Sequence, residues 1–413
     1  MNLTTRSKIA AAAFAALLSP GVALAAGNVE AVVHAGRLVV TGDAEGNELD
    51  INQVSLAAGE LRVTPGVGTT LNGDAAPIVF PGVTNGIGAN LGGGSDTLTI
   101  GAATVAGSLK LELGDLDDLL SLGASSFEGD ATVDLGEGTN GFDFHSSSLA
   151  GKLKVKSGAG TDDVNIYNSA SVAGDVKLDL GDGINEVSVF QGASLAGSLA
   201  QKGKDGDDDF TMSLSASIAG NLSLALGNGG NSISISASSV GGNVALKVGD
   251  ARDTFGVSDA ASIAGSLKLS MGDGDNYATL NTGSSVAGTI LVKGTNGADE
   301  LNLGLGSFGS RVKVSFGSGT NDVEVAGSTV PGDLAVKLGG DTDLVLIDQA
   351  TLQGNAQLIV SHGNNLVTCT NSTVAGNLVI KAGSGDDTID LAGTTVTGTP
   401  KIDPGGGTNT LTQ

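Results

Sequence analysis

Residues 151–197 read GKLKVKSGAGTDDVNIYNSASVAGDVKLDLGDGINEVSVFQGASLAG and contain one pattern twice. Each half has alternating apolar residues, a Gly-rich turn that carries Asp162 or Asn185, more alternating apolar residues, and a Ser-apolar-Ala-Gly segment. Alternation with a period of two is typical of strands with one buried face, and the runs between glycines are too short for helices. Each half is therefore expected to form one coil of short β-strands.

This pattern recurs along nearly all of the chain after about residue 91, with a step of 22 or 23 residues. Its most regular feature is a Ser or Thr followed by an apolar residue, found at Thr104, Ser126, Ser148, Ser171, Ser194, Ser217, Ser239, Ser262, Ser285, Ser307, Thr329, Thr351, Thr373 and Thr395. One unit cannot bury its apolar face alone, so successive units must stack. The sequence predicts an all-β, single-stranded parallel β-helix (a β-solenoid), right-handed, with about 14–15 coils of 22–23 residues.

A hydroxyl at one position of every coil is expected to form a structural ladder along the rod. Ser148, Ser171, Ser194 and Ser217 belong to this predicted ladder. A regular ice- or glycan-binding hydroxyl array is the functional alternative. The hydroxyl stands beside a small Ala and a Gly turn rather than on a doubled Thr face, which favours the structural role.

The chain divides into three parts. Residues 1–25 resemble a secretory signal peptide, with Arg6 and Lys8 before an apolar run and Ala23-Leu24-Ala25 as the cleavage site. Residues 26–90 are less regular and are expected to be N-terminal coils that cap the stack, whereas residues 91–413 form the regular β-helix. No other run approaches the roughly 18 apolar residues of a membrane span. We therefore expect Sec-dependent export to the extracellular space, the cell surface or the periplasm, with no membrane span.

The composition narrows the function classes. A formal net charge of −24 argues against nucleic acid as a partner, and it fits both a soluble secreted protein and a binder of divalent cations. The three His residues are scattered, no coil carries a long insertion, and Trp is absent, which disfavours a polysaccharide-active enzyme. Cys369, the only cysteine, occupies an apolar strand position and is predicted to be a buried hydrophobic side chain.

The Gly-rich turn carries Asp or Asn at one fixed position in every coil. These residues are Asp96, Asp118, Asn140, Asp162, Asn185, Asp208, Asn231, Asp253, Asn276, Asp299, Asn321, Asp343, Asn365, Asp387 and Asn409. After Asp118 the two residue types alternate strictly, so the true repeat is a pair of coils. We call this position the Asx position, and its residues are expected to form a ladder along the rod.

Three of these turns, GGGSDTLTI (92–100), GAGTDDVNI (158–166) and GSGDDTIDL (383–391), resemble the nonapeptide of RTX, or haemolysin-type, calcium-binding repeats. The resemblance implies that turn carbonyls and the carboxylates of Asp96, Asp162 and Asp387 bind calcium between coils, with weaker matches at Asp208, Asp253 and Asp343. The coils differ from that family because they have 22 or 23 residues with one such turn, and every second turn carries Asn.

A second regularity favours a ladder that is neutralised by the chain itself. A Lys precedes the Asp by six residues in the pairs Lys156–Asp162, Lys202–Asp208, Lys247–Asp253, Lys293–Asp299, Lys337–Asp343 and Lys381–Asp387, and the Asn coils lack it. Like charges about 4.8 Å apart repel by roughly 0.9 kcal/mol in water, and alternation with Asn doubles their spacing. Asp96 and Asp118 have no such Lys, so a metal ion is most expected near them.

These patterns favour an exported structural or adhesive β-solenoid scaffold without catalytic activity. The alternative is a secreted, RTX-like calcium-binding protein, and a polysaccharide-active β-helix enzyme ranks third. No cofactor is required, and calcium is the candidate ion. The last coil, near residues 405–413, has an open strand edge, so we expect end-to-end self-association or docking on a cell-surface or matrix partner.

Overall fold

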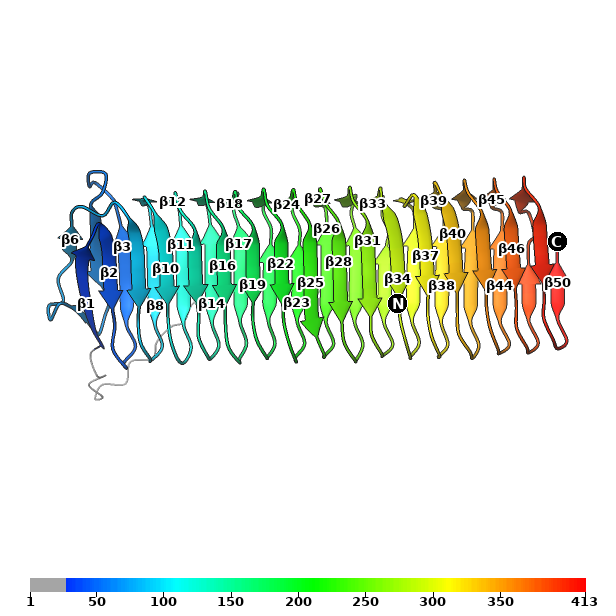
Figure 1. Ribbon diagram of the computed structural model, residues 1–413, viewed down its shortest axis with the longest axis horizontal. Helices are drawn as coiled ribbons and strands as arrows, with labels where there is room; N and C mark the ends of the chain where they lie inside the picture. Colours follow the sequence, from blue (N-terminus) through cyan, green and yellow to red (C-terminus); the bar gives the residue numbers. More distant parts are fainter. Residues whose placement is uncertain (1–26) are drawn as a thin grey trace.

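Three sheets run along a single rod in the computed structural model, which describes residues 27–413 (Figure 1). The predicted signal peptide, residues 1–25, lies outside the described residues. Strands of successive coils pair in parallel, and no helix long and apolar enough to cross a membrane occurs between residues 27 and 413. The expected all-β parallel solenoid of about 15 turns is confirmed.

The first sheet has 18 strands and is the first part of each coil. Its strands are β1 (Gly27–His34), β2 (Arg37–Thr41), β5 (Thr69–Leu71), β7 (Gly86–Asn90), β10 (Ser108–Glu112), β13 (Ala131–Asp134), β16 (Leu153–Lys156), β19 (Val176–Asp179), β22 (Leu199–Lys202), β25 (Leu222–Gly227), β28 (Val244–Val248), β31 (Leu267–Met271), β34 (Thr289–Lys293), β37 (Arg311–Ser315), β40 (Asp333–Lys337), β43 (Ala356–Ile359), β46 (Leu378–Lys381) and β49 (Pro400–Asp403).

The second sheet follows the Asx turn in each coil. Its strands are β3 (Glu48–Asn52), β4 (Leu61–Pro65), β6 (Ile78–Phe80), β8 (Thr97–Gly101), β11 (Leu119–Gly123), β14 (Gly141–His145), β17 (Asp163–Tyr167), β20 (Glu186–Val189), β23 (Asp209–Met212), β26 (Ser232–Ser236), β29 (Thr254–Ser258), β32 (Tyr277–Leu280), β35 (Glu300–Gly304), β38 (Asp322–Ala326), β41 (Leu344–Asp348), β44 (Leu366–Thr370), β47 (Thr388–Asp390) and β50 (Thr410–Thr412).

The third sheet has 14 strands of two residues each, and it contains the repeated Ser or Thr. Its strands are β9 (Thr104–Val105), β12 (Ser126–Phe127), β15 (Ser148–Leu149), β18 (Ser171–Val172), β21 (Ser194–Leu195), β24 (Ser217–Ile218), β27 (Ser239–Val240), β30 (Ser262–Ile263), β33 (Ser285–Val286), β36 (Ser307–Phe308), β39 (Thr329–Val330), β42 (Thr351–Leu352), β45 (Thr373–Val374) and β48 (Thr395–Val396).

The core is the narrow space between the sheets, and the period-two pattern decides which side chains enter it. In β16, Leu153 and Val155 are buried while Lys154 and Lys156 face outward. The register places equivalent residues of successive coils on one another, as in the pair Leu153↔Val176. Each buried Leu or Val therefore packs on its equivalents above and below, so that the apolar columns run the length of the rod. Cys369 is buried in such a column, as expected.

Glycine in the Asx turn allows the turns to stack closely. Gly183 has a φ of 124°, and a Cβ there would lie 1.6 Å from the carbonyl oxygen of Gly160 in the preceding coil. No side chain fits at that distance, so the Gly-rich turns that identify the repeat in the sequence are a packing requirement.

The N-terminal end of the rod is closed by antiparallel strands. β2 and β3 form a coil that stacks directly on β7 and β8, with the pairs Leu38↔Ile87 and Leu49↔Leu98. The segment between them, residues 53–85, leaves the stack, and within it β4 pairs antiparallel with both β3 and β6. In Figure 1 this segment projects from the blue end of the rod, so residues 53–85 lie at the N-terminal end of the stack.

Candidate functional site: the Asx ladder and the charged faces

The Asx residues point into the rod. Each follows the turn that joins the first sheet to the second, at the lower margin of Figure 1. From Asn47 to Asp387 their exposed fractions are at most 3%. The sequence predicts a ladder but not its burial, which places the carboxylates inside the corner of the coil and away from water.

Hydrogen bonds connect the ladder from coil to coil. The backbone N–H of Asn185 donates to Oδ1 of Asp208 at 3.1 Å, and the N–H of Asp208 donates to Oδ1 of Asn231 at 3.1 Å. The Asn231 amide also donates to the carbonyl of Gly229 at 3.0 Å and to Oδ1 of Asp253 at 2.8 Å. The Asn231 amide thus donates to a carbonyl of its own turn and to one oxygen of the next carboxylate, as a buried polar group requires.

The Asp turns leave one carboxylate oxygen without a partner. Asp Oδ1 accepts the bonds just described, whereas Oδ2 is buried and has no hydrogen-bond partner among the described residues. This holds for Asp96, Asp118, Asp162, Asp208, Asp253, Asp299, Asp343 and Asp387. A buried ionised oxygen without a partner is destabilising, and a bound proton or cation would relieve it.

Burial raises the pKa of seven of these carboxyl groups, and neighbouring carboxylates add to the effect; the seven are Asp96, Asp118, Asp162, Asp208, Asp253, Asp299 and Asp343. The pKa of Asp96 rises to about 7, because the carboxyl group is buried and because the charges of Asp118, on the next coil, and of Asp43 disfavour its ionisation. For Asp118, Asp208, Asp253, Asp299 and Asp343 the pKa rises to about 6, chiefly through burial. Hydrogen bonds from the preceding Asn or Asp oppose the shift but do not cancel it.

Asp96 and Asp118 differ from the other Asp residues because no Asn separates them. The N–H of Asp96 donates to Oδ1 of Asp118 at 2.7 Å, and the N–H of Asn47 donates to Oδ1 of Asp96 at 2.7 Å. Two buried carboxyl groups therefore lie on consecutive coils. Between residues 27 and 413, no three or more His, Cys, Asp or Glu side chains form a metal-binding group. A cation at Asp96 and Asp118 would need backbone carbonyls as its further ligands, which calcium accepts.

The structure does not bring the six expected Lys–Asp pairs together. Each Lys lies at or next to the end of a strand of the first sheet and points outward, whereas its Asp points into the core beyond the turn, as with Lys156 and Asp162. The ion pairs found in the described part of the chain are Lys110–Glu112 at 2.7 Å and Lys204–Asp182 at 3.8 Å. The alternation of Lys with Asp therefore does not reflect a direct contact.

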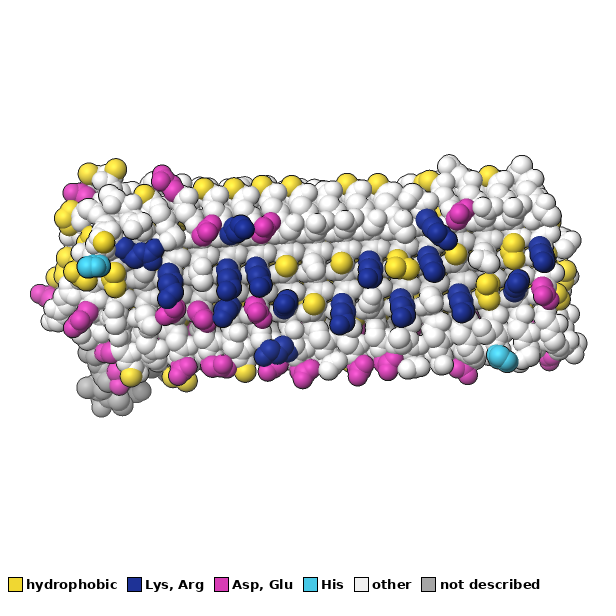
Figure 2. Space-filling model, in the orientation of Figure 1, with side chains coloured by type: hydrophobic (Ala, Val, Ile, Leu, Met, Phe, Trp, Pro, Cys, Tyr) yellow, Lys and Arg dark blue, Asp and Glu magenta, His cyan; other side chains and the backbone are white. Residues whose placement is uncertain are grey.

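The lysines instead gather on the outside of the first sheet. From β22 to β46 its strands carry eight basic residues and one acidic residue, Asp333, and we call the outward side of these strands and of β16–β19 the basic face. The basic residues between β22 and β46 are Lys202, Lys247, Lys268, Lys293, Arg311, Lys313, Lys337 and Lys381. Figure 2 shows Lys and Arg in rows along the rod, with acidic residues along the lower margin.

The second sheet carries the opposite charge. From β8 to β50 its strands contain nine acidic residues and no Lys or Arg, and we call their outward side the acidic face. The residues are Asp143, Asp163, Glu186, Asp209, Glu300, Asp322, Glu324, Asp348 and Asp390. Some are direct neighbours, as in the register Asp163↔Glu186↔Asp209, and burial together with the Glu186 charge raises the pKa of Asp163 to about 6.

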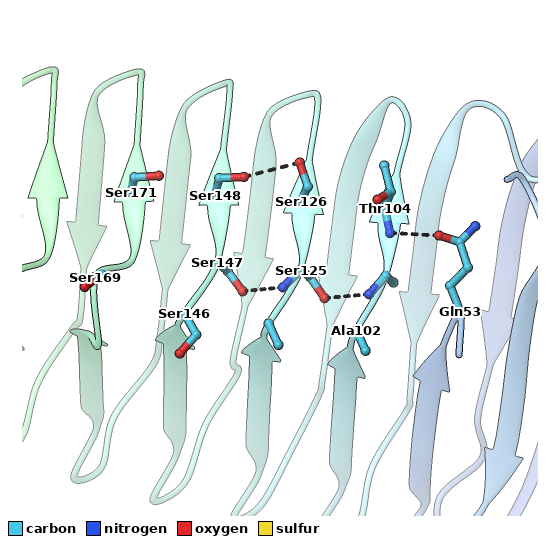
Figure 3. A pocket seen from close by; sticks show the side chains of 12 residues that line it. Gln53, Ala102, Thr104, Ser125, Ser126, Ser146, Ser147, Ser148, Ser169 and Ser171 are labelled. Carbon is cyan, nitrogen blue, oxygen red and sulfur yellow. Dashed lines mark hydrogen bonds between the residues drawn. The ribbon is translucent and has the colours of Figure 1, made fainter. Parts of the chain in front are cut away.

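The serine ladder is only partly connected. Ser148 donates to Ser126 at 3.2 Å and Ser217 to Ser194 at 3.3 Å, whereas neither Ser148 nor Ser194 bonds to the Ser171 hydroxyl between them. Figure 3 shows Ser126, Ser148 and Ser171 along an open groove that ends at Gln53. A second, buried row, which the sequence analysis missed, includes Ser125 and Ser147, where the Ser125 N–H donates to Ser147 Oγ at 2.9 Å. No titratable side chain lines this groove within residues 27–413.

Two further features were not predicted. His145, Tyr167 and Phe190 form an outward stack on three consecutive coils, with ring centroids 5.2 and 5.0 Å apart. The separation of basic residues on the first sheet from acidic residues on the second was also not predicted, because only the net charge of −24 for the whole chain was considered. Sorting the charged residues by their position before or after the Gly-rich turn would have revealed it.

No protein-family model, curated protein or solved structure matches this chain. The similarity of its turns to RTX repeats is therefore a similarity of short motifs.

Proposed function

We propose that this chain is an exported, non-catalytic scaffold whose repeated outer faces give it a structural or adhesive role. The observation that carries the proposal is the uninterrupted stacking from β7 to β50, in which one coil follows another without an inserted loop. A β-helix enzyme needs loops that build a cleft around its catalytic groups. A scaffold needs length and repeated surfaces, which identical coils supply.

The proposal is tested by removing one two-coil unit. Deletion of residues 200–244 joins Leu199 to Ala245, and the pairings Leu199↔Leu222 and Leu222↔Val244 show that this junction keeps the register. The shortened rod is expected to fold, with a maximum dimension about 10 Å smaller in small-angle X-ray scattering. Cells that export it are expected to attach to a surface or matrix as cells with the full chain do, and cells without the chain to attach less.

Two results would contradict the scaffold. One is normal attachment and envelope integrity in cells that lack the chain. The other is cleavage of a polysaccharide by the purified protein, measured as new reducing ends and abolished by a single substitution of a titratable residue. Export is tested separately, by fractionation of the cells and by N-terminal sequencing, which is expected to begin after Ala25.

Calcium binding is a second candidate function, favoured by the buried Oδ2 atoms of the Asp turns. If calcium binds there, mass action requires the melting temperature to rise in millimolar calcium relative to excess EDTA, followed by far-UV circular dichroism. The variant Asp96→Asn with Asp118→Asn is expected to reduce that rise, because it removes the two carboxyl groups on consecutive coils. Equal melting temperatures in calcium and EDTA would remove this candidate and leave the scaffold unaffected.

A further inference from the structure

We propose that copies of this chain associate side by side, with the basic face of one rod packed on the acidic face of the next, in parallel and without axial shift. This inference rests on the proposed scaffold and names its partner, a second copy of the chain. Its basis is the way in which charges of opposite sign are distributed along the two faces.

The basic face has two acidic residues, Asp179 in register with Lys156 and Lys202, and Asp333 in register with Arg311; none of these pairs forms an ion pair in the described part of the chain. Apolar side chains such as Leu291, Ile359 and Val379 occupy outward positions between the lysines, and they are half-buried rather than fully solvated. Lysine stems lying over small apolar groups form a surface that another protein can cover at low desolvation cost.

On the acidic face, carboxylates of neighbouring strands lie opposite one another. Like charges directly opposite one another in neighbouring strands are destabilising, yet Glu300 and Asp322 pair in this way. Burial and the charge of Glu324 raise the pKa of Glu300, and burial with the charges of Glu300 and Glu324 raises the pKa of Asp322 to about 6. Cations supplied from outside the rod would neutralise these stacks, and the basic face of another copy carries such cations in a regular array.

The clusters on the two faces belong to the same coils. Near β16–β22 the basic face has Lys154, Lys156, Lys177 and Lys202 with one acidic residue, Asp179, and the strands of the acidic face in those coils, β17–β23, have Asp163, Glu186 and Asp209. Near β34–β40 the basic face has Lys293, Arg311, Lys313 and Lys337, and β35–β41 have Glu300, Asp322, Glu324 and Asp348. The strands β26, β29 and β32 between the two acidic clusters carry no charged residue, whereas β28 and β31 of the basic face carry one Lys each, Lys247 and Lys268.

The charges also lie at the same height across the rod. Lys202 ends β22 immediately before its Asx turn, and Asp209 begins β23 immediately after that turn. The same holds for Lys293 at the end of β34 and Glu300 at the start of β35. The strands of the two sheets run in opposite directions across the rod in Figure 1, so a sideways translation brings Lys202 of one copy towards Asp209 of the next.

The available area is sufficient for a stable interface. Fifteen coils at about 4.8 Å and strands about 16 Å long give each face roughly 1,100 Å², compared with about 800 Å² per partner in a standard interface. Because two different faces meet, the contact does not close on itself, and it would extend into a row of parallel rods.

The first test is the mass of the mature protein at 20 mM and at 500 mM NaCl, by light scattering and sedimentation. We expect oligomers at low salt that dissociate at high salt, since the contact is electrostatic. The variant Lys293→Glu with Lys337→Glu and the variant Glu300→Lys with Asp322→Lys are each expected to associate at least tenfold more weakly. An equimolar mixture of the two is expected to form heterodimers, because their reversed faces are complementary.

The matched control is Arg62→Glu with Lys204→Glu, which changes the net charge as much as the basic-face variant but lies outside that face. It is expected to associate like the wild type. Far-UV circular dichroism of every variant reports the fold, so that a failure to associate is separated from a failure of the scaffold.

The axial register is tested by disulfide formation between variants that each carry one added cysteine besides the buried Cys369. Lys202→Cys mixed with Asp209→Cys is expected to form disulfide-linked heterodimers on oxidation, and Lys202→Cys mixed with Asp390→Cys is not. A folded wild type that stays monomeric at low salt and high concentration would overturn the proposal. So would a monomer that instead binds dextran sulfate through Lys293 and Lys337, because its partner would then be a polyanion.

Discussion

The Asn turns and the Asp turns share one backbone and differ in a single atom of the side chain. In an Asn turn the Nδ2 group of Asn231 donates to the Gly229 carbonyl and to the next carboxylate. In an Asp turn the equivalent Oδ2, as in Asp208, is buried without a partner. The comparison shows that the Asn amides add donors to the ladder and, after Asp118, keep successive carboxyl groups two coils apart, whereas the Asp residues introduce buried titratable groups.

Two deletions of one coil each are expected to show the largest effect of this difference on stability. Removal of residues 223–244 joins Leu222 to Ala245 and stacks Asp208 on Asp253, while removal of residues 200–222 joins Leu199 to Ser223 and stacks Asn185 on Asn231. At pH 7.5 the first product is expected to be less stable by about 3 kcal/mol, from Coulomb repulsion at about 4.8 Å with an effective dielectric constant near 20. Thermal melts of the two products measure it. Equal stability would mean that Asn has no spacing role.

The pH dependence of stability is expected to be dominated by the Asp turns with raised pKa values. A carboxyl group whose pKa is higher in the folded chain than in the unfolded chain binds protons preferentially in the folded state, so its stabilising effect is lost as the pH rises. For Asp96, with a pKa of about 7, the loss runs from about pH 4 to pH 7. In EDTA, the melting temperature is expected to fall between pH 5 and pH 8, and Asp96→Asn with Asp118→Asn to make that fall smaller. A rise with pH would contradict the buried state of these carboxyl groups.

Conversion of one Asp turn into an Asn turn is expected to stabilise the rod. Asp208→Asn introduces an amide that can donate to turn carbonyls as Asn231 does, and we expect a gain of about 1 kcal/mol at pH 8. The gain is expected to shrink at pH 5, where the wild-type carboxyl group binds a proton. Urea unfolding at both pH values measures it, and a loss of stability at pH 8 would show that Asp208 has a cation or another partner in solution.

The smallest effect is expected for the lysines. Lys156 is exposed and lies outside the turn that contains Asp162, so Lys156→Gln is expected to change the stability by less than about 0.5 kcal/mol. Glu128→Gln, on an exposed loop residue, is a matched control for loss of one surface charge. If Lys156→Gln instead lowered the free energy of unfolding by more than 1 kcal/mol, and not in the Asp162→Asn background, Lys156 would neutralise Asp162 directly.

The sequence predicts most of this fold because one coil determines the next. The step of 22 or 23 residues gives the register, and the period of two gives the buried columns that contain Leu153 and Val155. The Asx position could also be found without the structure. These features depend on local spacing, which a repeat preserves along the whole chain.

The unpredicted features depend on which side of a corner each residue faces. Lys156 and Asp162 are six residues apart, but the strand directs one outward and the turn directs the other inward. Their sequence spacing suggested a pair, and only the path of the backbone shows otherwise. The antiparallel pairing of β4 with β3 and β6 was equally hidden, because residues 53–85 occur once and no repeat indicates their partners.

Because every coil of the regular stack pairs only with its two neighbours, the rod has a simple mechanical behaviour. Under tension applied at the C-terminal coil, the strands should detach one coil at a time, each event releasing 22 or 23 residues, or about 80 Å of extended chain. An optical trap would record a series of equal steps at similar force. The rupture forces of Asn and Asp coils would then alternate at pH 8 and become alike at pH 5. The difference of one side-chain atom would thus appear as an alternation of high and low force along the extension trace.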